Sequence, residues 1–524
     1  MTNSENGLET NFDQLLIQSD DEEIDTENEG DLVDTLVVAP EESESESDEE
    51  GSGDDSDASW SDTAMPHDDW TFTSKCGPDD DVFNCMEPIQ YYELFLNSEM
   101  LDLIVLETNR YGKEKSEQFQ ETSTDEIKKF IGLCLQMGVI KLPNLRDYWS
   151  SRPALGGHCI AGKHMTRTRY EELLKYLHFA DNSQYDGNRL YKISKFVDLF
   201  NKASMEWYSF GKKVYIDESL VPFRSRIVFR QYIPSKRHRY GIKIFKLCAK
   251  DGYTQRIKIY AGKDPTRQGT VADKVVLELM EGYLDEGRVL CTDNFYSSVG
   301  LAEKLIGRRT HLVGTLRKNR KGIPQEIKDV KLKKGQVYYK QKRNGILILR
   351  WRDKRDLYMI STMHDGTMSR NQKPEVVESY NEMKGFVDQS DQMASYTPFV
   401  RKTAKWYIRI FFHVLTQTVI VNAWKLYKDV VKKVRLNDFK LDIIESLLAN
   451  ERIYTPIRKH QLEEIRGPKA NTRRRCSGCY SRISKEYGRR AALNRGRQVN
   501  TRCSKCQKYF CVDCFNSTHR LCNL

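Results

Sequence analysis

The sequence predicts an α/β protein built around one mixed β-sheet. Residues 214–219, 240–248 and 256–261 are rich in β-branched and aromatic side chains, which is typical of strands. A Lys-Asp-Gly turn signal at 250–252 separates the last two runs and favours an antiparallel meander. Apolar residues then recur at helical spacing through residues 270–283. Strands and a helix therefore follow one another in one continuous segment, as expected of an α/β protein.

The pattern continues with a β-rich run at 288–292, a helical stretch through Leu301 and Leu305, and another β-rich run at 311–316. Three strands, helix, strand, helix and strand is the layout of an RNase H-like sheet. In that layout the ends of the first and fourth strands are neighbours, and a later helix can approach them. The predicted fold class is therefore α/β with an RNase H-like core.

Three carboxylates occupy the positions that this layout brings together. Asp217 lies towards the end of the first β-rich run, Asp293 follows the fourth, and Asp388 lies on a later helical segment. Converging carboxylates repel one another unless a divalent cation neutralises them. A pair of Mg²⁺ (or Mn²⁺) ions suits in-line displacement at a phosphodiester. A single Asp at a strand end is commonly a turn residue, so the order of elements is what favours a catalytic metal site.

Several motifs resemble those of piggyBac-type DDE/D transposases. They are residues 217–224, 229–234, 240–245, 260–263, 293–296, 314–320 and 385–388, in the order of the family. The resemblance implies metal-dependent cut-and-paste excision and integration of double-stranded DNA at TTAA targets, by a nuclear homodimer that acts on transposon ends. It also implies that Asp217, Asp293 and Asp388 are the catalytic ligands. The sequence departs at Phe386, where the family commonly has a second glycine.

The resemblance and the β-rich run between residues 318 and 373 imply a discontinuous architecture. A mostly helical dimerisation and DNA-binding domain and an RNase H-like catalytic domain are each expected to consist of two separate segments. The expected order is an acidic disordered tail (1–74), the first helical-domain segment (75–212), the first catalytic-domain segment (213–320), a β-rich insertion (321–374), the second catalytic-domain segment with the third Asp (375–397), the second helical-domain segment (398–460), a basic linker (461–475) and a small cysteine-rich zinc-binding domain (476–524).

Charge is distributed unevenly along the chain. The formal net charge is +8, yet residues 1–74 contain 25 Asp/Glu and no Lys or Arg. Such a segment cannot bury enough apolar surface to order itself. Ser19 and Ser47 precede acidic runs and suit an acidophilic kinase, although a merely solubilising tail is the alternative. The remaining 450 residues carry 83 basic against 50 acidic side chains, and this excess indicates a nucleic-acid partner.

Basic side chains concentrate near the candidate catalytic acids, with aromatic residues between them. This composition suits a groove along a nucleic-acid backbone, whereas a solvated charged face is the ordinary alternative. The predicted DNA contacts are Arg224, Arg226, Arg230, Lys236, Arg237, Arg239, Arg317, Lys318, Arg401 and Lys402.

Two further residues are expected to support the site. Asp391 lies three positions after Asp388 and shares its helix face, so it is predicted to be a supporting charge, with a plain surface carboxylate as the alternative. Trp406 matches a family tryptophan near the active site and is predicted to stack on an unpaired base, with core packing as the alternative.

Capping signals mark the first helical domain. Ser123-Thr-Asp-Glu126 opens one helix, and Thr168 to Glu171 is predicted to open another. The most apolar later stretch, residues 408–421, is too short and too polar to span a bilayer, so no membrane partner is expected.

The C-terminal segment has the spacing of a double zinc site. Cys-x2-Cys pairs and a His-x2-Cys pair supply eight ligands, enough for two tetrahedral Zn²⁺ ions. Interleaved pairing would give one ion the first and third pairs, and sequential pairing stays open. The predicted ligands are Cys476, Cys479, Cys503, Cys506, Cys511, Cys514, His519 and Cys522. Residues 465–524 carry 15 Lys/Arg against two acids, so this module is expected to bind DNA.

Two other classes of function remain to be weighed. A host protein descended from such an element could bind DNA or chromatin without catalytic turnover. The zinc module could instead serve protein interaction, as RING-like modules or histone-tail readers do.

Overall fold

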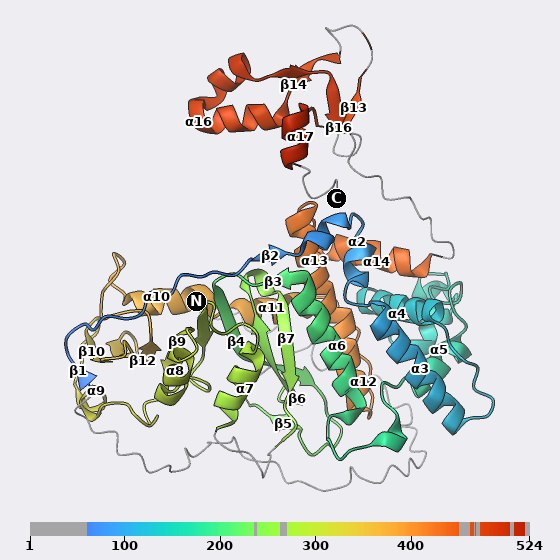
Figure 1. Cartoon of the computed structure of the whole chain (residues 1–524). Coiled ribbons are helices and arrows are strands. Elements are labelled where there is room, and N and C mark those ends of the chain that lie inside the picture. Colours follow the sequence, from blue (N-terminus) through green and yellow to red (C-terminus); the bar gives the residue numbers. More distant parts are fainter. Residues whose placement is uncertain are drawn as a thin grey trace, which may run out of the picture.

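The computed structural model describes residues 60–234, 238–262, 270–449, 462–465, 467, 472–503 and 508–518. A large mixed sheet occupies one side of the main body and a layer of helices the other (Figure 1). Segments from both halves of the chain contribute to the helical layer. The proposed domain boundaries stay predictions, while the α/β fold class is confirmed.

The central sheet has ten strands. Their order is β1-β10-β11-β12-β9-β8-β4-β6-β5, and β7 also pairs with β6. The strands are β1 (Trp60–Ser61), β4 (Lys213–Pro222), β5 (Gln231–Tyr232), β6 (Tyr240–Cys248), β7 (Thr254–Ile259), β8 (Val289–Thr292), β9 (His311–Leu316), β10 (Val337–Lys342), β11 (Leu347–Arg352) and β12 (Asp356–Ser361).

The middle of this sheet has the RNase H-like order that the sequence predicts. β4, β6 and β7 form an antiparallel meander, whereas β8 pairs parallel to β4 and β9 parallel to β8. The parallel register between β4 and β8 runs from Lys213↔Val289 to Ile216↔Thr292. Asp217 and Asp293 are therefore the first residues beyond this ladder on adjacent strands.

β4 is longer than the sequence predicts. The predicted run ends at Ser219, but β4 continues to Pro222. The reason is its second neighbour, because antiparallel pairing with β6 persists as far as Pro222↔Gly241 after the partnership with β8 has ended. Asp217 thus lies inside a strand, at the point where one of its two neighbours departs.

The β-rich insertion extends the same sheet. β10, β11 and β12 pair antiparallel in sequence order, and β12 pairs antiparallel with β9 through Tyr358↔Leu316 to Ser361↔Val313. The insertion is therefore hydrogen-bonded to the last strand of the RNase H-like core.

Helices cover both faces of the sheet. One apolar cluster packs α7 (Val271–Met280) and α8 (Val299–Ile306) against side chains such as Val214 and Ile216. A second cluster packs α10 (Glu375–Met383) and α11 (Phe386–Ala394) against the opposite face, where Tyr215 lies. Successive strand residues alternate between faces, so Asp217 and Ser219 share the face of Tyr215 and α11.

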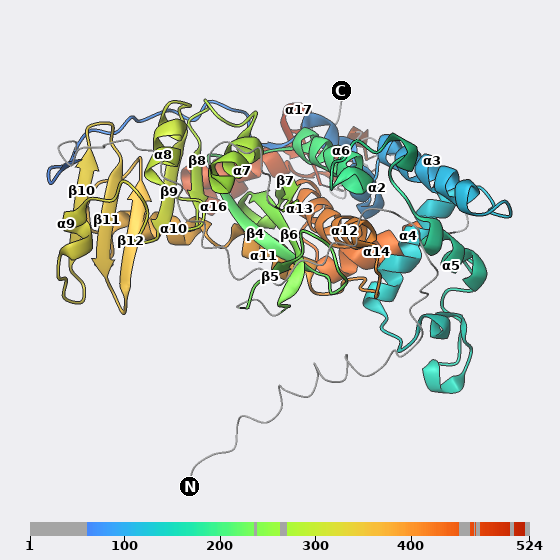
Figure 2. The same ribbon diagram turned by 90° about the horizontal axis from the view of Figure 1, so that it is seen from below.

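The helical layer has one apolar core built from two distant segments, and Figure 2 shows their helices side by side. Its first segment contains α2 (Pro88–Glu93), α3 (Ser98–Lys115), α4 (Thr124–Val139), α5 (Arg167–Tyr176) and α6 (Tyr191–Trp207). Its second contains α12 (Trp406–His413), the π-helical turn η7 (Val414–Thr418), α13 (Val419–Val430) and α14 (Leu436–Leu448). Asn422 of α13 hydrogen-bonds the backbone of Thr254 in β7 and ties this layer to the sheet.

The two predicted caps fare differently. Ser123 is the N-cap of α4, with its side chain accepting from Glu126 N. The cap at Thr168 is wrong, because Thr166 accepts from Arg169 N and α5 already begins at Arg167. Thr166, two residues earlier, caps the helix instead, and its side chain binds a different amide from those that Thr168 would bind.

Residues 60–74 lie against the sheet, so the expectation of disorder does not hold for this portion of the acidic tail. Trp60 and Ser61 form β1 at the edge beside β10 (Figure 1). The Trp70 ring lies 4.5 Å from that of His311, and the Arg288 guanidinium lies 4.9 Å from the Phe72 ring. Three aromatic residues therefore anchor a segment whose average composition indicated disorder. The preceding residues of the tail lie outside the described range of the chain.

Smaller elements lie around the main body and in the C-terminal module. β2 (Gly77–Pro78) pairs with β3 (Tyr208–Ser209), and short 3-10 turns include η2 (Asp80–Asn84) and η6 (Lys250–Gly252). The C-terminal module contains β13 (Leu462–Glu464), β14 (Arg474–Arg475), α16 (Ser477–Arg495), β15 (Gln498–Val499), β16 (Thr501–Cys503) and α17 (Val512–Thr518). Among the described helices, none has the length and apolar character needed to cross a membrane.

Candidate metal and nucleic-acid site

Two of the three predicted catalytic acids meet where β4 and β8 separate. Asp217 and Asp293 are both half-buried, and each accepts a backbone hydrogen bond near its own position. Glu218 N donates to Asp217 Oδ1 at 2.8 Å, and Phe295 N donates to Asp293 Oδ1 at 2.9 Å. These bonds orient the two carboxyl groups without neutralising their charge.

The environment of these acids disfavours their charged forms. Burial raises the pKa of Asp217 to about 8, together with the nearby charges of Glu218 and Asp293. Burial also raises the pKa of Asp293, followed by the charge of Glu218. A divalent cation between carboxylates would remove this cost. Oxygen ligands in a half-buried site are the donor set that Mg²⁺ and Mn²⁺ bind, so the residues present fit such an ion.

Glu218 is an acid that the sequence analysis did not single out. The Tyr296 hydroxyl, which is fully buried, donates to Glu218 Oε2 at 3.1 Å. Glu218 thereby adds a third negative group beside Asp217 and Asp293. Glu218 is next to Asp217 in the sequence, but alternation along a strand directs neighbouring side chains to opposite faces, so the pattern alone does not group the two.

Asp388 lies apart from this pair. It is exposed in the first turn of α11, whose N-cap is Gly385. Among the described residues, no three acids at this site have ligand atoms close enough together to share one ion. The helix nevertheless packs on the face of the sheet that carries Asp217. The role of Asp388 as third ligand stays a prediction.

Asp391 is engaged by the sheet. Its Oδ1 accepts from Lys246 Nζ at 2.7 Å, and both of its carboxylate oxygens lie 2.7 Å from Ser219 Oγ. Burial acts to raise the pKa of Asp391, but Lys246 and Ser219 outweigh it and hold that pKa below its usual value. The carboxylate is thus kept ionised by protein partners.

Cations border the open side of the acid pair. Arg317 Nε donates to Asn294 Oδ1 at 3.1 Å, and its guanidinium lies 5.9 Å from the Phe295 ring. Lys243 Nζ lies 4.2 Å from the centre of the same ring. Both cations act to lower the pKa of Asp293. Lys243 was not among the predicted DNA contacts, because its alternating position in β6 is typical of an ordinary strand residue.

The predicted DNA-contacting residues occupy different settings. Arg224, Arg226, Arg239, Lys318 and Lys402 are exposed, whereas Arg230, Arg317 and Arg401 are half-buried. Arg230 donates to Arg224 O at 2.6 Å and stacks over Tyr240, which gives the loop a fixed shape. Lys236 and Arg237 lie outside the described residues.

Trp406 begins α12 and is only 5% exposed. Its ring packs edge-on against Phe229, with centroids 5.1 Å apart. The structure therefore shows the core-packing arrangement, in which Trp406 supports the basic loop from beneath.

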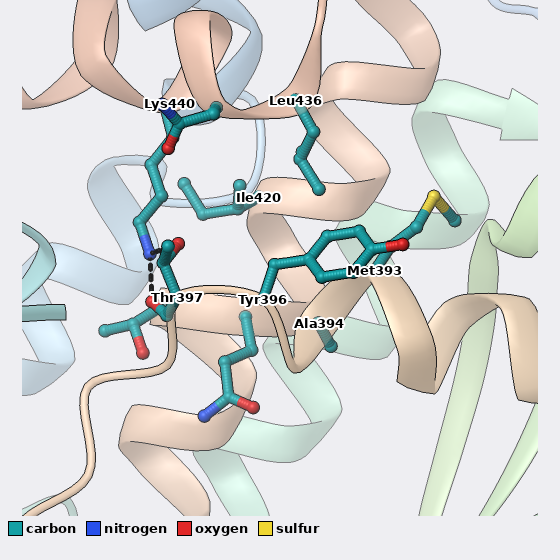
Figure 3. A pocket seen from close by; sticks show the side chains of 10 residues that line it. Met393, Ala394, Tyr396, Thr397, Ile420, Leu436 and Lys440 are labelled. Atoms are coloured by element: carbon teal, nitrogen blue, oxygen red, sulfur yellow. Dashed lines mark hydrogen bonds between the residues drawn. The ribbon is translucent and has the colours of Figure 1, made fainter. Parts of the chain in front are cut away.

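A cavity of about 130 Å³ lies beside the end of α11 (Figure 3). Met393 and Ala394 at the end of α11, Gln417 of the π-helical turn and Lys440 of α14 are among its lining residues. Lys440 Nζ contacts both the carbonyl oxygen and the hydroxyl of Thr397. Burial lowers the pKa of Lys440 to about 7, and the charge of Lys141 acts in the same direction.

The C-terminal module gathers four thiols. Cys476, Cys479, Cys511 and Cys514 are buried, and their sulfur atoms all lie within 4.8 Å of one another. This is the interleaved grouping of the first and third Cys-x2-Cys pairs. Burial acts to raise the pKa of Cys476, yet the amides of Cys479 and Cys511 lower it to about 7.

Such a set of four buried thiols is compatible with a tetrahedral Zn²⁺ ion. Of the expected second set, Cys503 is buried nearby, whereas Cys506, His519 and Cys522 lie outside the described residues.

Comparison with known proteins places this geometry in a family. Residues 87–424 match the family model described as Transposase IS4. The human PiggyBac transposable element-derived protein 3 is 27% identical over 479 residues, which cover 85% of this chain and 77% of that protein. The human PiggyBac transposable element-derived protein 2 is 27% identical over 377 residues, covering 66% of this chain and 62% of that protein.

A solved structure extends the similarity to three dimensions. It is a cryo-EM structure of the piggyBac transposase synaptic complex with hairpin DNA, 25% identical in sequence, with a TM-score of 0.66. The match covers 84% of this chain and 98% of the other.

Proposed function

The chain belongs to the piggyBac-type transposase family, and from this premise we propose that it is a metal-dependent DNA transposase. It excises a DNA element and integrates it at TTAA targets by in-line phosphoryl transfer. The observation that carries this proposal is the pair Asp217 and Asp293, two half-buried carboxylates with raised pKa values at the divergence of two parallel strands.

Asp217, Asp293 and Asp388 are the residues that would hold two Mg²⁺ (or Mn²⁺) ions. Ions bound there would supply charge neutralisation at the attacking oxygen and at the departing 3′ oxygen. Asp217 and Asp293 are oriented by their backbone hydrogen bonds, and Asp388 in the first turn of α11 is the proposed third ligand. Lys243 and Arg317 border the same opening and would bind the phosphates on either side of the scissile bond.

Double-stranded DNA is the proposed partner, in the form of transposon ends and a TTAA target. The similar solved protein is a synaptic complex with hairpin DNA, which supports DNA binding here. The exposed cations Arg224, Arg226 and Arg239 suit contacts with the backbone. A nuclear homodimer is the proposed acting form, and an acidophilic kinase acting at Ser19 and Ser47 is a proposed modifier of the acidic tail.

A catalytically silent DNA-binding protein is the second candidate. The names of the human relatives describe proteins derived from transposable elements, and this favours descent with loss of turnover. The retention of Asp217 and Asp293 in a costly, charge-repelling arrangement supports the enzyme instead.

We propose two Zn²⁺ ions in the C-terminal module, with Cys476, Cys479, Cys511 and Cys514 holding one of them. Cys503, Cys506, His519 and Cys522 would hold the other. The basic side chains of α16, such as Arg482 and Arg489, suit this module to binding DNA at the element ends.

Metal-dependent cleavage of DNA tests the function. The chain is incubated with end-labelled duplexes that carry its own flanking genomic repeats, with Mg²⁺, Mn²⁺ or EDTA. We expect nicking that requires the ion and is lost in Asp293→Asn, while Asp353→Asn, which changes an exposed acid of the insertion, cleaves normally. Binding of the repeats without scission by the wild type would favour the silent DNA-binding protein.

A further inference from the structure

Lys246 is a cation buried within the central sheet. It lies in β6, directly opposite Asp217 of β4 in the antiparallel register, and its side chain is 1% exposed. Cross-strand neighbours share a face of the sheet, so Lys246 lies on the face that α11 covers. Lysine is almost never fully buried without a charged partner, which indicates that a specific interaction holds it there.

That partner is Asp391 of α11. Lys246 Nζ lies 2.7 Å from Asp391 Oδ1, and Ser219 Oγ contacts both carboxylate oxygens at 2.7 Å. Oδ1 of Asp391 therefore has a donor from β6, and the single hydroxyl proton of Ser219 in β4 lies between its two oxygens. An ionised carboxyl engaged in this way is a poor candidate for a metal ligand.

Neighbouring contacts also hold α11 against the sheet. Ser390 Oγ hydrogen-bonds Thr254 Oγ1 of β7 at 3.0 Å. A Cβ atom at Gly252, whose φ is +77°, would come within 2.9 Å of Ser390 N, so the η6 turn approaches the helix as closely as glycine allows. His413 of α12 lies close enough to Lys246 and Asp391 to interact with both charges.

We propose that Lys246 is a positioning residue for the reaction. By binding Asp391 it sets the rotation and height of α11 on the sheet, and so places Asp388 toward Asp217 and Asp293. Asp388 precedes Asp391 by three residues, which is about 4.5 Å along a helix axis and on the same face. This inference rests on the proposed function, since Asp388 has a task only if metal-dependent cleavage occurs.

The inference assigns Asp391 a different role from that of Asp388. Asp391 holds α11 against the sheet, and Asp388 is the residue that is thereby positioned near the acid pair. Removing Asp391 alone would leave the buried ammonium group of Lys246 without its counter-charge, and removing Lys246 alone would leave the half-buried carboxylate of Asp391 without its cation, whereas removing both charges together is milder. The two residues should therefore behave as a coupled pair.

A double-mutant cycle on the full chain tests the proposal. Lys246→Met, Asp391→Asn and the double variant are compared for unfolding temperature, for cleavage rate and for the Mg²⁺ concentration that gives half-maximal cleavage. Lys258→Met changes a half-buried lysine of the adjacent strand β7 and serves as the matched control.

We expect Lys246→Met to lower the unfolding temperature and to raise the half-maximal Mg²⁺ concentration at least tenfold. The double variant should recover at least half of both losses, and the control should leave the Mg²⁺ requirement unchanged. A double variant that folds as stably as the wild type but does not cleave would overturn the proposal, because Asp391 would then act on the metal itself.

The cycle also separates this proposal from the proposed function. If the wild type fails to cleave, the proposed function fails. The unfolding temperatures alone then test whether Lys246 and Asp391 are coupled. Recovery of the unfolding temperature in the double variant would still support Asp391 as the partner of Lys246. If the losses of unfolding temperature from the two single changes simply added, Lys246 and Asp391 would not be coupled, and the proposal would be refuted.

Discussion

Asp217 and Asp293 occupy positions where a negative charge is costly to the fold. Burial raises the pKa of both carboxyl groups, the charges of Glu218 and Asp293 raise that of Asp217 further, and the charge of Glu218 raises that of Asp293. Asp217→Asn removes one of the two ionisable groups and keeps the shape of the side chain. In EDTA we expect its unfolding temperature to exceed that of the wild type, measured by differential scanning calorimetry.

Addition of Mg²⁺ supplies the control for this prediction. The ion should stabilise the wild type by binding the folded state, and it should stabilise Asp217→Asn much less. An equal response of the two proteins to Mg²⁺ would mean that Asp217 is not a ligand.

Lys440 gives the stability a dependence on pH. Its pKa is about 7 in the fold, below the ordinary value of 10.5, because burial disfavours the charged form. The unfolded chain therefore binds a proton more readily, and the folded state loses stability as pH falls from about 10.5 to 7, at about 1.4 kcal/mol per pKa unit.

Lys440→Met removes this proton linkage. The stability of the variant relative to the wild type should increase as pH is lowered from 10 to 7 and level off below 7. Urea unfolding at a series of pH values measures the difference. A difference that does not vary with pH would contradict the assigned burial of the ammonium group.

At the residue scale, the sequence predicts which residues are functional better than it predicts which residues contact them. Asp217 and Asp293 could be picked out because each stands at a β-run that belongs to a known order of elements. Lys246, Glu218 and Lys243 could not, because their importance depends on register and on which face a helix covers. A strand pattern shows that a lysine alternates, but not what lies opposite it.

At the element scale, β8 and β9 meet at a site that admits no side chain. A Cβ atom at Gly314 would overlap Ser297 Oγ and would lie 2.8 Å from Thr292 O. Gly314→Ala should therefore destabilise the protein by about 1–3 kcal/mol and disturb the strand that leads to Asp293. Denaturant unfolding measures this effect.

Gly300 offers the matched control. It lies in α8 with nothing within 4 Å of an added Cβ atom. Gly300→Ala should stabilise the protein by roughly 0.5–1 kcal/mol through helix propensity. If both substitutions had the same effect, the close contact at Gly314 would not exist.

The C-terminal module should depend on its metal. Four buried thiols without an ion would leave a small cluster whose apolar core consists mainly of cysteines and two phenylalanines. We expect zinc, measured by mass spectrometry under native conditions, and loss of the module's protection from proteolysis when a strong chelator is added. Cys479→Ser should reproduce the effect of the chelator, whereas Cys76→Ser, at an exposed cysteine, should not. Full protection in the absence of metal would contradict a structural zinc site.

Element types were predictable where periodicity was long and clear, as in the meander and in α7. The length of β4 was not, because the extra residues follow from pairing with β6 after β8 departs. Likewise, the N-cap of α5 is Thr166, since two threonines compete to cap the same helix. Both differences arise from competition between neighbouring partners, which a linear pattern does not record.

At the scale of the whole molecule, segments remote in sequence complete one another. Helices from residues 88–207 and 406–448 share one apolar core, and residues 60–74 fasten the far side of the sheet. Removal of residues 1–59 should leave the unfolding temperature unchanged, whereas removal of residues 1–74 should lower it by several degrees. Scanning calorimetry of the two truncated proteins measures this. Equal stability of the two would mean that Trp70 and Phe72 contribute nothing to the sheet.

The layered architecture was predictable because the order of strands and helices in residues 213–316 admits few arrangements. The anchoring of residues 60–74 was not, because three aromatic residues decide it against the average composition of an acidic segment. The packing of residues 60–74 depends on surfaces that exist only after the sheet has formed.

Excision in cells tests the central claim most directly. A donor carrying a reporter between the chain's own flanking repeats is supplied with the wild-type chain or with Asp293→Asn. We expect seamless excision by the wild type and none by the variant. If neither protein excises the donor while both still bind the repeats, the chain is a DNA-binding protein. Its acid pair then has no catalytic role.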